Sequence, residues 1–324
     1  MKIYRTTIKP QASNDKIGYK TPVLFLGSCF TENIGNKMQD LKFPVLVNPF
    51  GVLYNPASAR QSLEIILDKR DFQESDLGFH NENWFSFYHD TEFSNPDKKA
   101  CLKKINTKLN QARQHFKKAN YLIVTFGTAW IYEYKESEKI VSNCHKIPAK
   151  EFDRYKLGVE DIFVQWAKLI NRIEDFNPDL KIIFTVSPVR HWKDGAIQNQ
   201  LSKSTLILAI HQLKKIFKNV QYFPAYEIMM DDLRDYRFYA DDMLHPSKAA
   251  IDYIWEQFSE TYFEKDTDEI TDQVDKIILA KAHRPFNKDT EGHLKFKKSQ
   301  IKKINALVKR YPFLDFREEL EYFK

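Results

Sequence analysis

The sequence predicts an α/β protein with a doubly wound parallel sheet, in which helices cover both faces in a three-layer arrangement. Short apolar runs without polar alternation recur along the chain, and such runs are typical of parallel strands buried on both faces. Amphipathic segments long enough for helices separate these runs, which is the order of successive βαβ units. In sheets of this type, ligands bind at the carboxyl ends of the strands.

The first predicted strand is the apolar run at residues 23–26, which ends at Gly27. Thr31 follows at the position of a helix cap, and the apolar residues after it have the spacing of one helix face. A second, shorter apolar run at residues 44–47 predicts the next strand. Residues 58–67 have helical periodicity, so the chain begins as strand, helix, strand, helix.

An insertion separates these elements from the next strand. Residues 70–96 lack a regular period but are rich in aromatic residues, which predicts an ordered insertion rather than a linker. A helix at residues 97–118 and a strand at residues 121–126 follow. An amphipathic helix at residues 159–173 then leads into the next strand, at residues 181–186.

The predicted sheet ends with a helix at residues 203–217 and a short strand at residues 220–223. A last helix at residues 247–263 closes the layer. Residues 266–324 are predicted to be mostly helical, with an interruption at residues 284–287.

The composition favours a cytoplasmic protein that binds no nucleic acid. Fifty basic and forty-four acidic residues give a net charge of +6 and are intermingled along most of the chain. The lysine-rich stretch at residues 295–309 is interpreted as a solvated helix face, although it could also attract phosphates or acidic polymers. Three widely spaced cysteines fit reduced thiols. The N-terminal residues lack an apolar secretory segment, and no apolar run reaches the length of a membrane span.

The first motif with chemical potential is Gly27-Ser28-Cys29-Phe30, which stands between the first predicted strand and the next helix. A serine in such a turn can project its hydroxyl above the edge of the sheet, while the following amides point at an oxyanion. The alternative is that Ser28 only caps the helix. We expect the sulfur of Cys29 to turn away into the packing between strand and helix, where a thiol is inert.

The second motif places Asp242 three residues before His245, directly ahead of the last predicted helix. Ester hydrolysis by a serine requires an imidazole that accepts the hydroxyl proton and a carboxylate that holds the tautomer of the imidazole. One short turn can supply both groups. The alternative is that Asp242 caps the turn and His245 is an ordinary surface residue.

In this order along the chain, Gly27-Ser28-Cys29-Phe30 and Asp242-x-x-His245 resemble the SGNH, or GDSL-like, hydrolase superfamily. The chain is most similar to the bacterial GSCFA-domain family, whose motif it matches through Phe30 and leaves at Thr31. The resemblance extends over about residues 20–260. Three further blocks also resemble those of that family: residues 48–56, 125–130 and 185–191.

The resemblance implies a flavodoxin-like doubly wound fold and a catalytic triad of Ser28, His245 and Asp242. In that superfamily the oxyanion hole combines the amide of the nucleophile, a glycine amide and an asparagine side chain, and Gly51 matches the glycine. Ala129 stands where the asparagine is expected, and loss of such a donor can lower the rate by a factor of about 10² to 10³. The candidates to replace the asparagine are Thr128, Asn48 and Asn55.

A third feature is the pair Arg190 and His191, which follows the strand predicted at residues 181–186. These residues can contact an anionic or hydroxylated substrate group; the alternative is a structural loop histidine. No metal-ligand spacing and no glycine-rich phosphate motif occur, so we predict neither a metal nor another cofactor. Several aromatic residues are expected in loops near the site, where they can pack or stack on sugars: Trp84, Tyr88, Trp130, Tyr132, Tyr134 and Trp192.

The leading hypothesis is a serine esterase that removes an acyl group, such as acetyl, from a carbohydrate or small-molecule ester. Two alternatives stay open: an O-acyltransferase that uses the same acyl-enzyme, and a non-catalytic module that binds glycans or lipids. We expect residues 1–264 to form the hydrolase domain and residues 265–324 to form a helical extension packed on or beside it. The sequence carries no signal for an oligomeric state.

Overall fold

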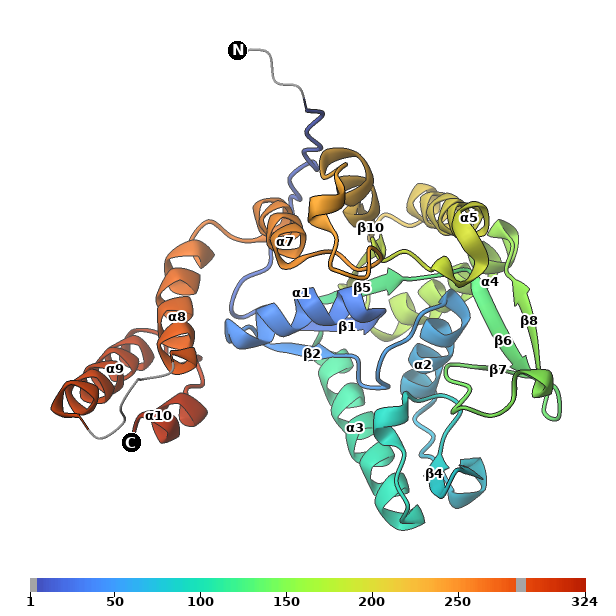
Figure 1. Cartoon of the computed structure of the whole chain (residues 1–324), viewed down its shortest axis with the longest axis horizontal. Helices are drawn as coiled ribbons and strands as arrows, with labels where there is room; N and C mark the ends of the chain where they lie inside the picture. The colour runs from blue at the N-terminus through green and yellow to red at the C-terminus, as the bar shows by residue number, and fades with distance from the viewer. Residues whose placement is uncertain (1–4, 284–289) are drawn as a thin grey trace.

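The centre of the molecule is a five-stranded sheet in which all strands are parallel (Figure 1). The computed structural model describes residues 5–283 and 290–324. The strand order β10-β9-β5-β1-β2 corresponds to the flavodoxin-like order 2-1-3-4-5, so the chain reverses its direction of winding between β1 and β5. The strands are β1 (Val23–Gly27), β2 (Val45–Val47), β5 (Tyr121–Phe126), β9 (Lys181–Val186) and β10 (Val220–Phe223).

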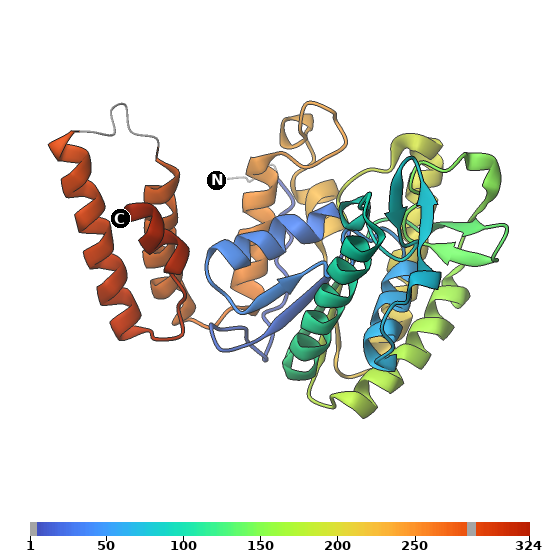
Figure 2. The ribbon, with the colours of Figure 1, turned by 90° about the horizontal axis from the view of Figure 1, so that it is seen from below.

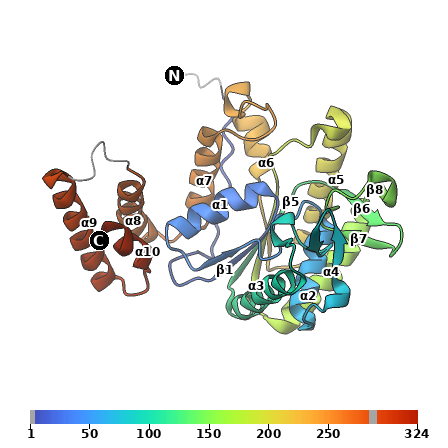
Figure 3. The ribbon, with the colours of Figure 1, turned by 60° about the horizontal axis from the view of Figure 1, so that its bottom comes forward.

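Alternate residues of the strands enter two separate apolar cores, as strand geometry requires. Leu24 and Leu26 of β1 belong to the core beneath α2, α3, α4 and α5, whereas Val23 and Phe25 belong to the core beneath α1 and α7. Figure 3 shows α1 and α7 on one face of the sheet and α2, α3 and α4 on the other. The predicted three-layer fold is thereby confirmed. The helices are α1 (Cys29–Asp40), α2 (Pro56–Asp68), α3 (Lys98–Lys118), α4 (Val159–Phe176), α5 (Gly195–Ile216) and α7 (Lys248–Tyr262).

Two smaller sheets lie outside the predicted pattern. The insertion after α2 contains the antiparallel pair β3 (Gly78–His80) and β4 (Asn83–Phe85). Between β5 and α4, three antiparallel strands form a second small sheet, so the expectation that Trp130, Tyr132 and Tyr134 lie in loops is wrong. The same expectation is wrong for Trp84, which lies in β4. Trp130, Tyr132 and Tyr134 occupy every second position, which is the period of a β-strand, so the sequence pattern could have predicted the strand. These strands are β6 (Trp130–Tyr134), β7 (Lys139–Val141) and β8 (Phe152–Lys156).

Helix α5 begins at Gly195, well before the start predicted at residue 203. Polar residues in its first turns, such as Asn199 and Ser202, hid the helical period, because their side chains are buried against loops rather than exposed. The remaining short elements are η1 (Glu74–Asp76), η2 (Thr91–Phe93), η3 (Ala149–Glu151), η4 (Trp192–Asp194), α6 (Ala225–Glu227), η5 (Ile228–Asp232) and η6 (Tyr236–Phe238).

Three helices after α7 form a group beside the α/β layers: α8 (Thr267–Ala282), α9 (Glu291–Arg310) and α10 (Arg317–Phe323) (Figures 1 and 2). The group meets the layers where Lys42 forms an ion pair with the buried Glu319 at 2.9 Å. On α9, Ile304 and Leu307 are buried, which confirms the amphipathic interpretation of this segment. The predicted interruption at residues 284–287 lies outside the described residues. The division into two domains at residue 264 stays a prediction.

In the part of the chain that the structure describes, no helix has the length and apolarity needed to cross a membrane.

Candidate functional site

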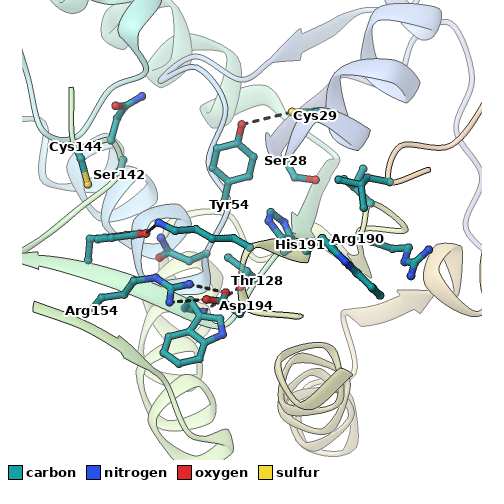
Figure 4. Close-up of a pocket in the computed structure, with 18 of the residues that line it drawn as sticks. Ser28, Cys29, Tyr54, Thr128, Ser142, Cys144, Arg154, Arg190, His191 and Asp194 are labelled. Carbon is teal, nitrogen blue, oxygen red and sulfur yellow. Dashed lines mark hydrogen bonds and ion pairs between the residues drawn. The ribbon is translucent and has the colours of Figure 1, made fainter. Parts of the chain in front are cut away.

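A cavity of about 510 Å³ opens at the switch point of the sheet, beside the carboxyl ends of β1, β5 and β9 (Figure 4). Six residues predicted for the site line it: Ser28, Asn55, Thr128, Arg190, His191 and His245. Asp242 lies behind His245, whereas Gly51 and Asn48 do not line the cavity. The other lining residues are Cys29, Tyr54, Trp130, Tyr132, Val141, Ser142, Asn143, Cys144, Arg154, Val189, Trp192, Lys193, Asp194 and Leu244.

Gly27 makes the tight turn that positions Ser28. Its φ is +144°, and a Cβ at this position would lie 2.3 Å from the carbonyl oxygen of Thr125 on the neighbouring strand β5. Only glycine tolerates both constraints. Ser28 then occupies the N-cap position of α1, but its hydroxyl makes no capping hydrogen bond. The hydroxyl is buried and has no partner among the described residues, so it is free to bond to a ligand or a base.

The orientation of Cys29 differs from the prediction. Helix α1 begins at Cys29 itself, and the rotation of the helix places Phe30 and Thr31, rather than Cys29, in buried positions. The sulfur of Cys29 instead lines the cavity and lies 3.6 Å from the hydroxyl oxygen of Tyr54. Burial, and then the contact with Cys29, raise the pKa of Tyr54 above its usual value, so Tyr54 stays protonated.

The turn before α7 brings Asp242 and His245 together. Nδ1 of His245 lies 2.6 Å from Oδ2 of Asp242, and Oδ1 of Asp242 accepts hydrogen bonds from the backbone N–H groups of Leu244 and His245, both at 2.9 Å. These backbone hydrogen bonds, and then that of the imidazole, lower the pKa of Asp242 to about 2. The carboxylate therefore stays charged and holds Nδ1 as the protonated nitrogen. Nε2 of His245 is then the proton acceptor.

Ser28 and His245 line the same cavity without a hydrogen bond between them. Catalytic hydrogen bonds commonly tighten only when a substrate is bound, so this geometry is compatible with a serine and its base. The side chain of His245 is 49% exposed, which gives water a route to the imidazole.

His191 is a second histidine close to Ser28. A Cβ on Gly127 would lie 3.1 Å from Nε2 of His191 and 3.4 Å from Cβ of Ser28, so both side chains pack against this glycine. Burial, followed by the charge of Lys203, lowers the pKa of His191 to about 4. His191 forms no ion pair with a carboxylate within the described residues. The low pKa makes His191 a weak proton acceptor, and His191 lacks the carboxylate partner that His245 has in Asp242.

Several expected oxyanion donors are already engaged in the chain. The N–H of Gly51 donates to the carbonyl of Asn48 at 2.8 Å, and the N–H of Thr128 donates to the carbonyl of Tyr54 at 2.9 Å. The N–H of Ser28 makes a longer hydrogen bond, 3.3 Å, to the carbonyl of Thr125. The side-chain oxygen of Asn48 accepts the N–H of Gly27 at 2.9 Å, which fixes the turn from outside the cavity.

Two other donors remain at the cavity. The backbone N–H of Cys29 makes no hydrogen bond to another described residue, as is usual in the first turn of a helix. Asn55 caps α2 by accepting the N–H of Ser58 with Oδ1 at 2.8 Å, while its Nδ2 has no partner within the described chain. The positive end of α1 and the amide of Asn55 are thus the groups best suited to bind a developing negative charge.

One face of α5 holds the loops after β5 and β9 in place. Ser202 Oγ accepts the N–H of Ala129 at 2.8 Å, and one turn earlier Asn199 Oδ1 accepts the N–H of His191 at 2.9 Å. Ala129 is fully buried. At the position compared with the oxyanion asparagine, the chain therefore has a packing residue whose amide is held by α5.

Lys203 on the same face was missed by the sequence analysis. It is fully buried, and its Nζ donates to the carbonyl oxygens of Gly127 and Ser187, both at 2.7 Å. Burial lowers the pKa of Lys203 to about 7. The available signal was a lysine at helical spacing from the apolar residues Leu206 and Ile210, which follow it on the same face.

Comparison with known proteins identifies the family of this chain. Residues 22–258 match the model described as the GSCFA family, and residues 274–324 match the model described as the GSCFA domain protein, C-terminal domain. The chain belongs to the GSCFA family. No curated protein matches this GSCFA chain. Within the described residues, no group of three His, Cys, Asp or Glu side chains is placed to hold a metal ion.

Several solved structures are similar in part to this GSCFA protein. A carbohydrate esterase family 3 protein from Talaromyces cellulolyticus shares 12% identity at a TM-score of 0.32, covering 78% of this chain and 99% of its own. An acetyl xylan esterase from the rumen bacterium Butyrivibrio proteoclasticus shares 11% identity at a TM-score of 0.37, covering 74% of this chain and 63% of its own. A mutant acetyl esterase with an acetate ion shares 12% identity at a TM-score of 0.31, covering 78% of this chain and 99% of its own. Likenesses at these TM-scores say nothing about the activity of this chain.

Proposed function

We propose that this GSCFA protein is a serine esterase of the SGNH superfamily, with Ser28 as nucleophile, His245 as base and Asp242 as the carboxylate that orients the base. The observation that supports it most is that an uncommitted serine hydroxyl and a histidine held by a carboxylate open on one cavity at the switch point of the sheet. Residues 1–264 are proposed as the catalytic part and residues 265–324 as its helical extension.

In the first half of the reaction, Ser28 Oγ attacks the acyl carbon and Nε2 of His245 takes the hydroxyl proton. Asp242 stabilises the imidazolium that forms, because its low pKa keeps it ionised. The tetrahedral intermediate collapses when His245 returns the proton to the oxygen of the departing alcohol. The alcohol leaves, and the acyl group stays on Ser28 as an ester.

The developing oxyanion is proposed to bind the N–H of Cys29 and Nδ2 of Asn55. Both donors belong to cavity-lining residues and are uncommitted within the described residues, whereas the amides of Gly51 and Thr128 are engaged elsewhere. Preorganised donors of this kind contribute a factor of about 10² to 10³ each to the rate. Asn55 would thus take the role that the superfamily gives to the asparagine absent at Ala129.

In the second half, water attacks the acyl group on Ser28 while His245 accepts a proton from it. The half-exposed position of His245 supports hydrolysis over transfer to a second alcohol, because water reaches the base directly. The bond between the acyl carbon and Ser28 Oγ then breaks, His245 returns the proton to Oγ, and the carboxylic acid is released.

The test is labelling of the purified protein with a fluorophosphonate probe, followed by peptide mapping. We expect the label on Ser28, and we expect Ser28→Ala and His245→Ala to lose it because nucleophile and base act together. Ser142→Ala is the matched control, since Ser142 lines the same cavity without a neighbouring histidine–aspartate pair.

Two results would overturn the proposal. A folded protein that reacts at no serine would favour a binding module, and a label that moves to Cys29 or survives in Ser28→Ala would place the nucleophile elsewhere. Folding of each variant is checked by circular dichroism, so that loss of label is not caused by loss of structure.

A further inference from the structure

The wall of the cavity opposite Ser28 is built by the small antiparallel sheet. In Figure 4, Ser142, Cys144 and Arg154 lie across the cavity from Ser28. We call Trp130, Tyr132, Arg154 and Lys193 the distal wall. The first three residues lie on β6 and β8, outside the α/β layers, and Lys193 lies in η4 after β9. An ester bound at Ser28 would direct one of its two parts against this wall.

The distal wall has an excess of positive charge. Arg154 forms a bidentate pair with Asp194 at 2.7 and 2.6 Å, and these two charges cancel. Lys193 donates to the hydroxyl of Tyr132 at 2.9 Å and has no carboxylate partner in the described part of the chain. Asp194 is the single carboxylate among the described residues that line the cavity, so the ammonium of Lys193 is left uncompensated.

A second uncompensated cation lines the cavity nearer to His245. The guanidinium of Arg190 lies 4.1 Å from the ring centroid of Trp192 and donates to the carbonyl of Met243 at 3.3 Å. It forms no ion pair with a described carboxylate. The cavity as a whole therefore favours a ligand with negative charge over a neutral one.

The cations of the distal wall are held by aromatic side chains. Arg154 lies 4.3 Å from the ring centroid of Trp130, and Lys193 is tethered by its hydrogen bond to Tyr132. A tethered cation loses less conformational entropy when it binds an anion, so the wall is preorganised. The rings beside it offer apolar surface on which the face of a sugar can pack.

We propose that the alcohol part of the ester is an acidic sugar that binds against the distal wall, and that the carboxylate of this sugar pairs with Lys193. This inference rests on the proposed esterase function and deepens it by naming the substrate class. A cavity of about 510 Å³ lies in the usual range for small-molecule sites and accommodates a sugar ester. A neutral sugar would leave the ammonium of Lys193 without a counter-charge.

The test compares acetylated glucuronic acid with acetylated glucose, which differ only at C6, where the acid has a carboxylate and glucose has a hydroxymethyl group. We expect the wild type to prefer the acid by about tenfold or more in kcat/KM, since a hydrogen bond between two charged groups is stronger than one between neutral groups. Lys193→Met should lose most of this preference, mainly through KM, and Lys193→Arg should retain it. Raised ionic strength should weaken the preference in the wild type.

Lys150→Met is the matched control, because it removes one positive charge at a highly exposed position in η3, outside the cavity. Its preference should equal that of the wild type. Equal kcat/KM for both sugars in the wild type would overturn the proposal, as would an equal loss of preference in Lys150→Met and Lys193→Met, which would indicate only a long-range effect of charge.

Failure of the proposed esterase function can be distinguished from failure of the proposed acidic-sugar site. If no ester is cleaved, binding of free glucuronic acid and free glucose is measured by calorimetry on the full chain and on Lys193→Met. A preference for the acid that Lys193→Met loses would support the acidic-sugar site without the esterase. Equal binding of the two sugars would overturn it.

Discussion

Replacing Lys203 with methionine should remove a large part of the pH dependence of stability above neutral pH. The amine is fully buried and donates to the carbonyls of Gly127 and Ser187, both at 2.7 Å. A neutral amine has two N–H groups, which match these two acceptors, whereas the third N–H of an ammonium has no hydrogen-bond partner among the described residues. Burial accordingly lowers the pKa of Lys203 from 10.5 to about 7.

The sign of the effect follows from proton linkage. Between about pH 7 and 10.5 the unfolded chain holds the proton of Lys203 and the folded chain does not, so the free energy of unfolding rises with pH in this window. Each pKa unit corresponds to about 1.4 kcal/mol, so the full effect is about 5 kcal/mol. Between pH 7.5 and 9.5 the wild type should gain about 2 to 3 kcal/mol from this group.

Methionine cannot donate to the two carbonyls, and each buried carbonyl left without a donor costs about 1 to 3 kcal/mol. Lys203→Met should therefore be less stable than the wild type at pH 9.5. The gap should narrow as the pH falls toward 7, because the wild type then bears the cost of a buried charge.

Urea unfolding at pH 7.5, 8.5 and 9.5 measures both effects. Lys215→Met serves as the control, since Lys215 lies exposed on the same helix and its replacement should shift the curve without changing its slope against pH. A constant difference between the wild type and Lys203→Met across these pH values would refute the assignment of a neutral, buried amine.

Three further predictions concern the surroundings of Ser28. Asn55→Asp keeps the oxygen that caps α2 but removes the amide donor, so it should unfold near the wild-type temperature while ester turnover falls by about 10²-fold; unchanged turnover would remove Asn55 from the oxyanion site. Ser202→Ala leaves the N–H of Ala129 without an acceptor and should destabilise the protein by about 1 to 3 kcal/mol in urea unfolding, and a smaller loss would show that the loop relaxes. Cys29→Ala should keep most of the turnover of a small ester, because the proposed oxyanion contact of this residue is its backbone; a dead, folded variant would point to a thiol enzyme.

The central sheet could be predicted from the sequence because its strands are buried on both faces and appear as uninterrupted apolar runs. The bounds predicted for β9 and β10 agree with the structure. The strand β6 was missed because its faces differ, with Ile131 fully buried and Trp130 partly exposed at the cavity. Alternation over one short strand is easily mistaken for an irregular loop.

The site was predictable only where its parts are local in sequence. Asp242 and His245 share one turn, so their contact follows from a spacing of three residues. The engagement of the Thr128 N–H by Tyr54, the turn of Cys29 toward the cavity and the burial of Lys203 depend on partners far away in the chain. No local pattern encodes such partners, because they are set by how the layers pack.

The position of Ala129 connects these observations. The superfamily that the sequence resembles has an oxyanion asparagine at this position, whereas Ala129 is fully buried and only packs. We propose that loop support and oxyanion binding are separate tasks in this chain. Ser202 and Lys203 hold the loop from behind, and the donor comes from Asn55 at the start of α2, next to the Tyr54 carbonyl that also binds the loop. It follows that damage to the loop supports should appear first as lost stability, and damage to Asn55 first as lost turnover. A variant of Ser202 that abolished turnover without loss of stability would show that the two tasks are still joined.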